Sequence, residues 1–313
     1  MRTFWYLKLA MLAAVLANLV TLAPAQTPAP SAAQSQQARE QELRAAWEAA
    51  DKAGTRGPAD VRLIDQAVLK LPNDYFFVPK AEGTRIMRAL GNLVSEQTFG
   101  GLIVGTRPSD QWIVVVRYIK EGYIKDDDAK DWNADELLQN LKDGTAEANK
   151  DRATRGFPEM EILGWIEKPT YDATSHRLVW SLLSKDKDAP EAGIKGINYN
   201  TYALGRDGYF SLNLLTNSNR IANDKSAAHE LLAALNYNDG KRYTDFNAAT
   251  DHIAEYGLAA LVGGVVAKKL GLFALIALGV AKFGKIIALA VAAFGAGIWK
   301  LVRARSKTSP PNT

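Results

Sequence analysis

Short apolar runs recur through the middle of the chain, and they predict strands that follow one another in consecutive pairs. We expect strands at 61–64, 67–71, 75–78, 99–104, 112–119, 160–167, 177–183, 198–204 and 209–215. Tight turns join several of these runs, at 72–74, at 108–110 and most clearly at 205–208, where two glycines enclose Arg-Asp. Because the strands do not alternate with helices, the pattern predicts an α+β fold with a mainly antiparallel sheet and packed helices, rather than a doubly wound parallel sheet.

Apolar residues at helical spacing predict the helices that pack on this sheet. We expect helices at 39–52, 82–90, from 133 to 152 or 155, at 224–235 and at 248–257, the last leading into the apolar C-terminal segment. The third has the clearest start, because Asn133 is a favourable N-cap and Glu136 follows three residues later. Together, the strands and helices predict one domain over residues 39–256.

The first 25 residues have the parts of a secretory signal peptide. Arg2 and Lys8 precede an apolar run that ends in the small-residue triplet Ala-Pro-Ala at 23–25. We therefore expect export and a mature chain that starts near Gln26, with an uncleaved membrane helix as the alternative. Residues 26–38 are rich in Pro, Ala, Gln and Ser, a composition typical of a low-complexity tether.

The C-terminal segment 257–302 is apolar, contains no acidic residue and is interrupted by lysines. Its apolar pieces are each shorter than the about 20 residues that span a bilayer, so a span has to include some of the lysines. We expect the span within 270–302, where the frame 284–302 costs least because Lys285 and Lys300 then lie near its two ends. The basic tail 303–313 predicts a cytoplasmic C-terminus. A two-helix hairpin (257–281 and 283–302) and a flat amphipathic helix at 257–281 before the span remain alternatives.

One face of this anchor combines lysines with small residues: Lys282, Lys285, Ala288, Ala292 and Ala296. Small residues allow helices to approach closely, and charges within a membrane usually face a bundle interior or water. This face predicts contact with another helix, in a homo-oligomer or a membrane-protein partner. The alternative is that alanine is simply abundant and that the lysines extend to the membrane surface.

The net charge of +4 and the pI near 9 suggest nucleic-acid binding until the charges are located along the chain. Ten of the 38 Lys and Arg residues lie in 1–25 and 257–313, which leaves 28 basic against 34 acidic side chains in between. An acidic domain has no electrostatic reason to bind a phosphate backbone, so we expect the lipid bilayer and not nucleic acid as a partner. The absence of cysteine excludes disulfides, thiolate metal sites and cysteine nucleophiles.

Asp126, Asp127 and Asp128 form the densest acidic cluster. They do not make a calcium loop, because Lys130 takes the fifth position and Leu137 replaces the bidentate Glu. The cluster is either an acidic loop whose carboxylates favour a helix N-terminus or a cation site.

Asp172 and His176 lie four residues apart in an expected hairpin and form the second candidate. They predict an acid–base pair, unless Asp172 instead bonds its own backbone in an Asx-turn.

Motifs of hydrolases, zinc proteases and nucleotide-binding proteins (G-x-S-x-G, H-E-x-x-H, Walker A and G-x-G-x-x-G after a strand) do not occur, and the three histidines are dispersed. No catalytic, metal-ligating or cofactor-binding residue is therefore assigned. A non-enzymatic binding or scaffolding protein of the envelope is the favoured hypothesis. An envelope hydrolase or metal-dependent enzyme that uses 126–128 or the Asp172 and His176 region is the alternative.

A series of short motifs makes the chain similar to one known group. The motifs follow in order at 71–77, 91–92, 122–130, 144–149, 164–180, 198–201, 204–206 and 240–246. In these the sequence resembles the DUF2167 family of bacterial membrane-anchored proteins, from about residue 58 into the lysine-containing anchor. The resemblance implies a bacterial envelope location and supplies no activity, substrate or catalytic residue.

Reporter fusions test the expected topology, in which the main domain is periplasmic and one span crosses the inner membrane. Reporters fused after Tyr256 and after Thr313 should report opposite compartments, because a single span separates the two positions. Two reporters on the outside would establish the two-helix hairpin instead.

Overall fold

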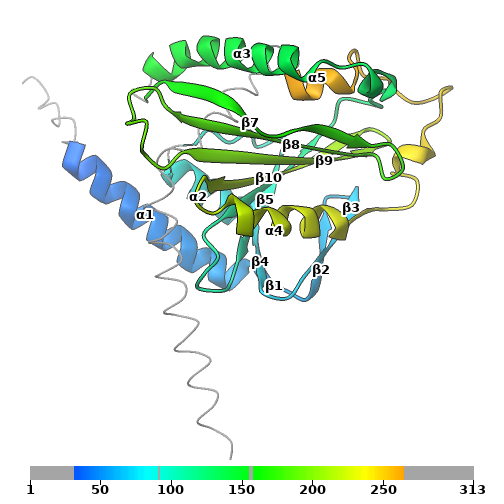
Figure 1. The fold of residues 1–313 in the computed structure, drawn as a ribbon. Coiled ribbons are helices and arrows are strands. Elements are labelled where there is room, and N and C mark those ends of the chain that lie inside the picture. Colours follow the sequence, from blue (N-terminus) through cyan, green and yellow to red (C-terminus); the bar gives the residue numbers. More distant parts are fainter. Residues whose placement is uncertain (1–31, 91, 155–157, 264–313) are drawn as a thin grey trace, which may run out of the picture.

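An eight-stranded antiparallel sheet forms the centre of the protein in a computed structural model, which describes residues 32–90, 92–154 and 158–263 (Figure 1). Its strands, in spatial order, are β1 (Thr55–Arg56), β4 (Tyr75–Pro79), β5 (Phe99–Gly105), β6 (Ile113–Ile119), β10 (Gly208–Asn217), β9 (Gly196–Gly205), β8 (Arg177–Asp186) and β7 (Met160–Asp172). All of the pairings are antiparallel. The predicted α+β class with a mainly antiparallel sheet is confirmed.

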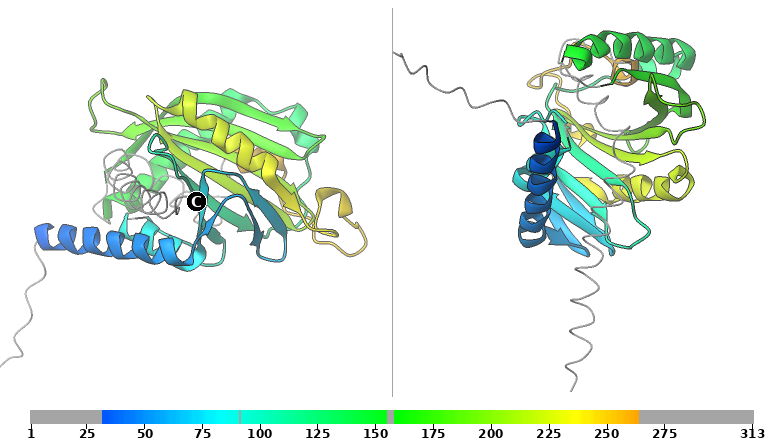
Figure 2. Two further views of the ribbon diagram at one scale, coloured as in Figure 1. Left: turned by 90° about the horizontal axis from the view of Figure 1, so that it is seen from below. Right: turned by 90° about the vertical axis from the view of Figure 1, so that its left-hand side faces the viewer.

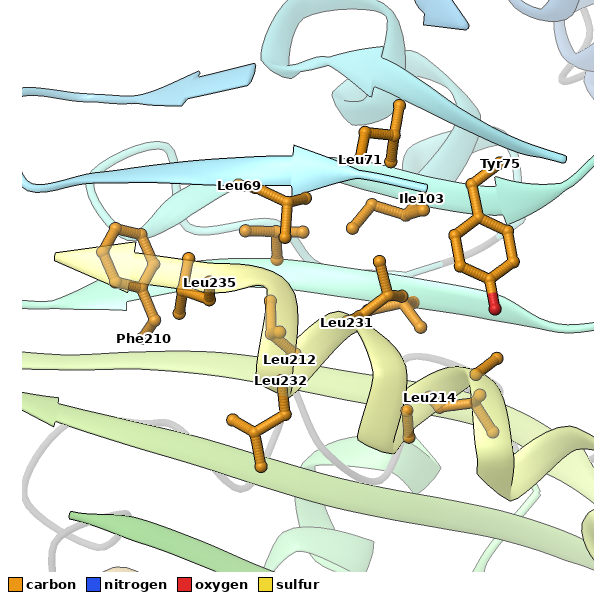
Figure 3. Packing of buried hydrophobic residues seen from close by; sticks show 14 of the residues in the cluster. Leu69, Leu71, Tyr75, Ile103, Phe210, Leu212, Leu214, Leu231, Leu232 and Leu235 are labelled. Atoms are coloured by element: carbon orange, nitrogen blue, oxygen red, sulfur yellow. The ribbon is translucent and has the colours of Figure 1, made fainter. Parts of the chain in front are cut away.

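A small sheet and one helix cover one face of the large sheet. The small sheet has the order β11 (Leu235–Tyr237), β3 (Ala67–Leu71) and β2 (Ala59–Leu63), and α4 (Ile221–Ala234) leads directly into β11. Figure 3 shows Leu69 of β3, Leu231 of α4 and Leu212 of β10 meeting in this core, where each is at most 1% exposed. Burial of these apolar side chains holds the small sheet against the large one.

Two separate helical covers lie on the opposite face, toward different ends of the strand order (Figure 2). The first consists of α1 (Ala32–Ala53) and α2 (Lys80–Ala89), which pack on β4 and β5. The second consists of α3 (Ala134–Thr154) and α5 (Leu258–Gly263), which pack on the β7, β8 and β9 side. Both covers are apolar where they meet the sheet, as amphipathic helices on a core should be.

The start of α3 confirms the predicted N-cap. The Asn133 Oδ1 atom accepts from the backbone N–H groups of Asp135 at 2.9 Å and Glu136 at 3.4 Å, and the Asn133 amide donates to Glu136 Oε1. Near the other end of α3, the buried Asn149 side chain exchanges two hydrogen bonds of 2.8 Å with the backbone of Met160. The helix is therefore capped at its start and hydrogen-bonded near its other end to the first residue of β7.

The helix predicted at 248–257 is wrong. The chain there is extended enough to pair with the loop after β6: Tyr123 N–H donates to the His252 carbonyl, and Ala254 N–H donates to the Tyr123 carbonyl. Asp251 is also held by a two-pronged ion pair with Arg206. Because tertiary partners occupy these backbone and side-chain groups, the local helical pattern does not decide the conformation, and the helix begins only at Leu258.

The runs 67–71 and 75–78, joined by the predicted turn at 72–74, belong to different sheets. β3 has β2 and β11 on its two sides, so it has no free edge left for β4, which pairs with β1 and β5. Asp74 has a φ of 63°, a left-handed conformation that Asp tolerates. The turn therefore carries the chain from one sheet to the other.

The described residues reach only part of the terminal segments for which export and anchoring are predicted. α1 begins at Ala32, so its first turns include part of the low-complexity stretch 26–38. The predicted signal peptide and the predicted helix-contact face of the anchor lie outside the described residues. No helix within the described ranges is long and apolar enough to cross a membrane.

Leu231→Ala tests whether α4 joins the two sheets through burial. Leu231 is fully buried between them, so its truncation should lower the free energy of unfolding by about 2–5 kcal/mol in denaturant titrations of the full chain. Ser226→Ala, at an exposed position of the same helix, should change it by less than about 0.5 kcal/mol. Equal effects of the two substitutions would contradict this account of the core.

Candidate functional site

The acidic loop between β6 and α3 is the first candidate, and its three carboxylates have different surroundings. The loop forms a short 3-10 turn at Asp127–Lys130, and the side chain of Asp127 is exposed. Asp126 and Asp128 are partly buried and hydrogen-bonded to other segments of the chain. The loop therefore does not direct three carboxylates at one point.

Asp128 binds the start of α5. Its Oδ1 accepts from Leu258 N–H and its Oδ2 from Ala259 N–H, both at 3.0 Å. The first N–H groups of a helix have no partner within the helix, and a carboxylate satisfies them and favours the positive end of the helix dipole. Gly257 allows the approach, because a Cβ there would lie 2.4 Å from Asp128 Oδ2. The acidic loop thus holds the first turn of the apolar C-terminal segment.

Asp126 and His176 come together through a third residue, Tyr171. The Tyr171 hydroxyl donates to Asp126 Oδ2 at 2.6 Å and lies 3.0 Å from His176 Nδ1. His176 Nδ1 is also 3.6 Å from Asp126 Oδ2. Burial, followed by the bond to Asp126, raises the pKa of Tyr171 well above its usual value, so the hydroxyl keeps its proton. The sequence pattern indicated Asp126 and His176 as candidates, but it gave no signal that Tyr171 joins them.

Aromatic rings extend this cluster toward the loop that precedes α5. The His176 ring lies 4.1 Å from the Tyr243 ring, which lies 4.4 Å from Tyr123, which in turn stacks on Phe246 at 3.8 Å. The Tyr243 hydroxyl also donates to the Ile124 carbonyl at 2.8 Å. The stack therefore ties the acidic loop, the β7–β8 turn and the 243–246 segment together.

Asp172 turns away from this cluster. Its Oδ1 accepts from Thr174 N–H at 2.9 Å and its Oδ2 from the Ser175 hydroxyl at 2.6 Å, which is the arrangement of an Asx-turn. The Ser175 and Thr174 bonds lower the pKa of Asp172. The exposed Asp172 carboxylate closes the β7–β8 turn, and the partner of His176 is Tyr171.

A second polar cluster lies on the α4 side of the sheet and joins Glu167, Tyr199 and His229. The Tyr199 hydroxyl donates to Glu167 Oε2 at 2.7 Å and lies 2.7 Å from His229 Nε2, while Lys225 Nζ is 3.6 Å from the same Glu167 oxygen. Burial and the Glu167 bond raise the pKa of Tyr199 far above neutrality, which makes its hydroxyl a hydrogen-bond bridge and not a base. The sequence gives no signal for this cluster, because its members come from β7, β9 and α4.

Neither cluster has the composition of a metal centre. Within the described ranges, no three His, Cys, Asp or Glu side chains lie close enough together to hold a metal ion. The two clusters share one chemistry, in which a tyrosine hydroxyl bridges a carboxylate and an imidazole.

Asp128→Ala tests the assigned role of the acidic loop. The loss of two hydrogen bonds to the start of α5 should lower the free energy of unfolding by about 1–2 kcal/mol, and amide exchange should accelerate at Leu258 and Ala259. Asp127→Ala should change stability by less than about 0.5 kcal/mol, because that side chain is exposed. Similar exchange at Leu258 in the two variants would show that Asp128 does not cap the helix.

Comparison with known proteins gives one informative match. The search of curated proteins gives none. The family model described as a protein of unknown function (DUF2167) matches residues 55–295, and this range includes the acidic loop, both tyrosine-centred clusters and all of the strands of the large sheet. The matched residues make up more than half of the chain, and the chain belongs to the DUF2167 family.

Proposed function

We propose that this protein is a non-enzymatic binding or scaffolding module that a C-terminal anchor presents at the membrane. One observation carries the proposal: three of the four carboxylates that the sequence offered for chemistry make structural hydrogen bonds, and the fourth, Asp127, is exposed. Asp128 caps α5, Asp126 accepts from Tyr171 and Asp172 closes its own turn. Carboxylates that accept these hydrogen bonds make the fold more rigid, and their oxygen atoms are occupied rather than directed at a substrate proton.

The contacts around α5 support presentation in a fixed orientation. Ala254 is bonded to Tyr123, and the Leu258 N–H group is shared by the Lys125 carbonyl and Asp128. Consecutive bonds of this kind leave no free linker between the domain and the segment 257–302, which we propose as the membrane anchor. On this proposal the domain faces the periplasm and the anchor lies in the inner membrane. Lys282, Lys285, Ala288, Ala292 and Ala296 then contact a partner helix or a second copy.

An envelope hydrolase is the competing function, and the convergence of Asp126, Tyr171 and His176 is the observation in its favour. The geometry weakens it, because the carboxylate and the imidazole both engage the same hydroxyl, whose proton is firmly held. A general base needs a lone pair directed at a substrate proton. The hydrogen bonds of the cluster join the acidic loop to the β7–β8 turn, which is a structural role.

Tyr171→Phe distinguishes the two functions through stability. If the cluster is structural, removal of the hydroxyl should cost about 1–2 kcal/mol of unfolding free energy, since the lost hydrogen bond has a charged partner. Asp126→Asn should cost a similar amount, and the double variant should cost less than the sum, because both substitutions remove the same bond.

The control for this experiment is Asp127→Asn, an equal change of charge at an exposed position of the same loop. Replacement of a residue that is kept for function often makes the protein more stable. Neutral or stabilising effects of both Tyr171→Phe and Asp126→Asn would therefore overturn the structural assignment and favour an active site.

A further inference from the structure

Arg117 of β6 is buried without a counter-ion. Its side chain is on the helix-covered face of the sheet, and the residue is 8% exposed. It lies opposite Ser211 of β10 and Phe99 of β5 in the strand register. Among the residues that the structure describes, Arg117 has no ion-pair or hydrogen-bond partner for its guanidinium, and the titratable groups that act on it are the neutral hydroxyls of Tyr202 and Tyr209.

The rest of the chain has no acidic side chain with which to supply the missing charge. All 34 Asp and Glu residues lie within the described ranges, since 1–31, 91, 155–157 and 264–313 contain none. None of these 34 carboxylates pairs with Arg117. No acidic side chain of the protein therefore neutralises Arg117.

An unpaired buried cation is unfavourable, because desolvation of the charge costs several kcal/mol unless an anion offsets it. Burial lowers the pKa of Arg117 to about 10, so the guanidinium is still protonated at neutral pH. The side chain thus keeps a positive charge and five N–H donors at a position where water is largely excluded.

The surface around Arg117 is polar where a covered sheet face is usually apolar. Ser211, Asn213, Asn200 and Asn198 lie on the same face and are at most 6% exposed. Asn213 is opposite Asn200, and its amide reaches Asn198 Oδ1 at 3.4 Å. The Asn213 Oδ1 atom and the indole N–H of Trp180, beside Asn200, are buried without a hydrogen-bond partner within the described part of the chain.

These residues form one polar strip between the two helical covers. On one side, Val115 and Leu215 belong to the core under α1 and α2; on the other, Trp180 and Leu182 belong to the core under α3 and α5. Figure 2 shows α1 and α3 apart from each other over this face. Apolar side chains at these positions would have continued the two cores into one, so the strip interrupts an otherwise apolar layer.

We infer that this polar strip is a binding site for the oxyanion group, carboxylate or phosphate, of a small polar ligand. Arg117 supplies the charge and the planar fork that binds two oxygens of such a group. The amides of Asn200 and Asn213 bind the neutral polar part of the ligand. The inference is independent of the proposed function, since it uses none of the residues of the acidic loop.

Thermal unfolding of the purified full chain in sodium phosphate and in sodium succinate, each compared with sodium chloride at equal ionic strength, tests the site. A ligand that binds the native state alone raises the melting temperature in a saturable manner. We expect at least one of the two anions to raise it by more than about 2 °C, with saturation. No saturable rise with either anion would overturn the inference.

Three variants assign the effect to Arg117. Arg117→Met should abolish the saturable rise, and Arg117→Lys should reduce it, because Lys keeps the charge and loses the fork. Arg62→Met removes an exposed arginine of β2 and should keep the full rise. If Arg117→Met does not fold, Arg117→Lys still tests the assignment. An anion-induced rise in its melting temperature equal to that of the native protein would overturn the role of Arg117.

Discussion

The structure depends on three central strands that are buried on both faces. Every residue of β6 and β9, and all but the last residue of β10, is buried. These three strands need a covering layer on each face of the sheet. Apolar side chains left exposed on either face would not contribute the burial free energy that stabilises the sheet. The small sheet with α4 supplies one cover, and the α1–α2 and α3–α5 pairs together supply the other.

The divided cover explains why segments from distant parts of the sequence have to be fastened to each other. The α3–α5 cover is built from a helix in the middle of the chain and a helix from its last described residues. Asp128 joins them by capping α5 from the loop that leads into α3, and the ring stack from His176 to Phe246 fixes the same loop to the β7–β8 turn. Polar and aromatic contacts thus fix the position of α3 and α5 on the sheet, because apolar burial alone is not directional.

The strip around Arg117 lies where the two covers do not meet. A sheet face that served stability alone would carry apolar side chains at these positions, since an uncompensated charge and unpaired amides oppose folding. Natural proteins accept such costs mainly at functional sites. The two tyrosine-centred clusters differ in this respect, because each carboxylate and imidazole in them has a hydrogen-bond partner.

The sequence by itself determined most of the strands and helices, with 248–257 as an exception. Alternation and turn residues located the β9–β10 hairpin, and the Asn133 and Glu136 pair located the start of α3, since local hydrogen bonds and burial patterns act within a few residues. The same information identified Asp126 and His176 as notable side chains. It did not reveal that Tyr171 joins them, because that bond depends on the placement of one loop against a hairpin 45 residues away.

Only the tertiary structure decided the features that rest on contacts between distant segments. Pairing with Tyr123 overrode the helical pattern of 248–257, and the occupied edges of β3 sent β4 into the other sheet. Arg117, Asn200 and Asn213 stand in three strands that each look like ordinary buried segments. Their position side by side on one face of the sheet follows from strand order and register. Local sequence patterns do not encode this order, because each strand has several possible neighbours with compatible alternation.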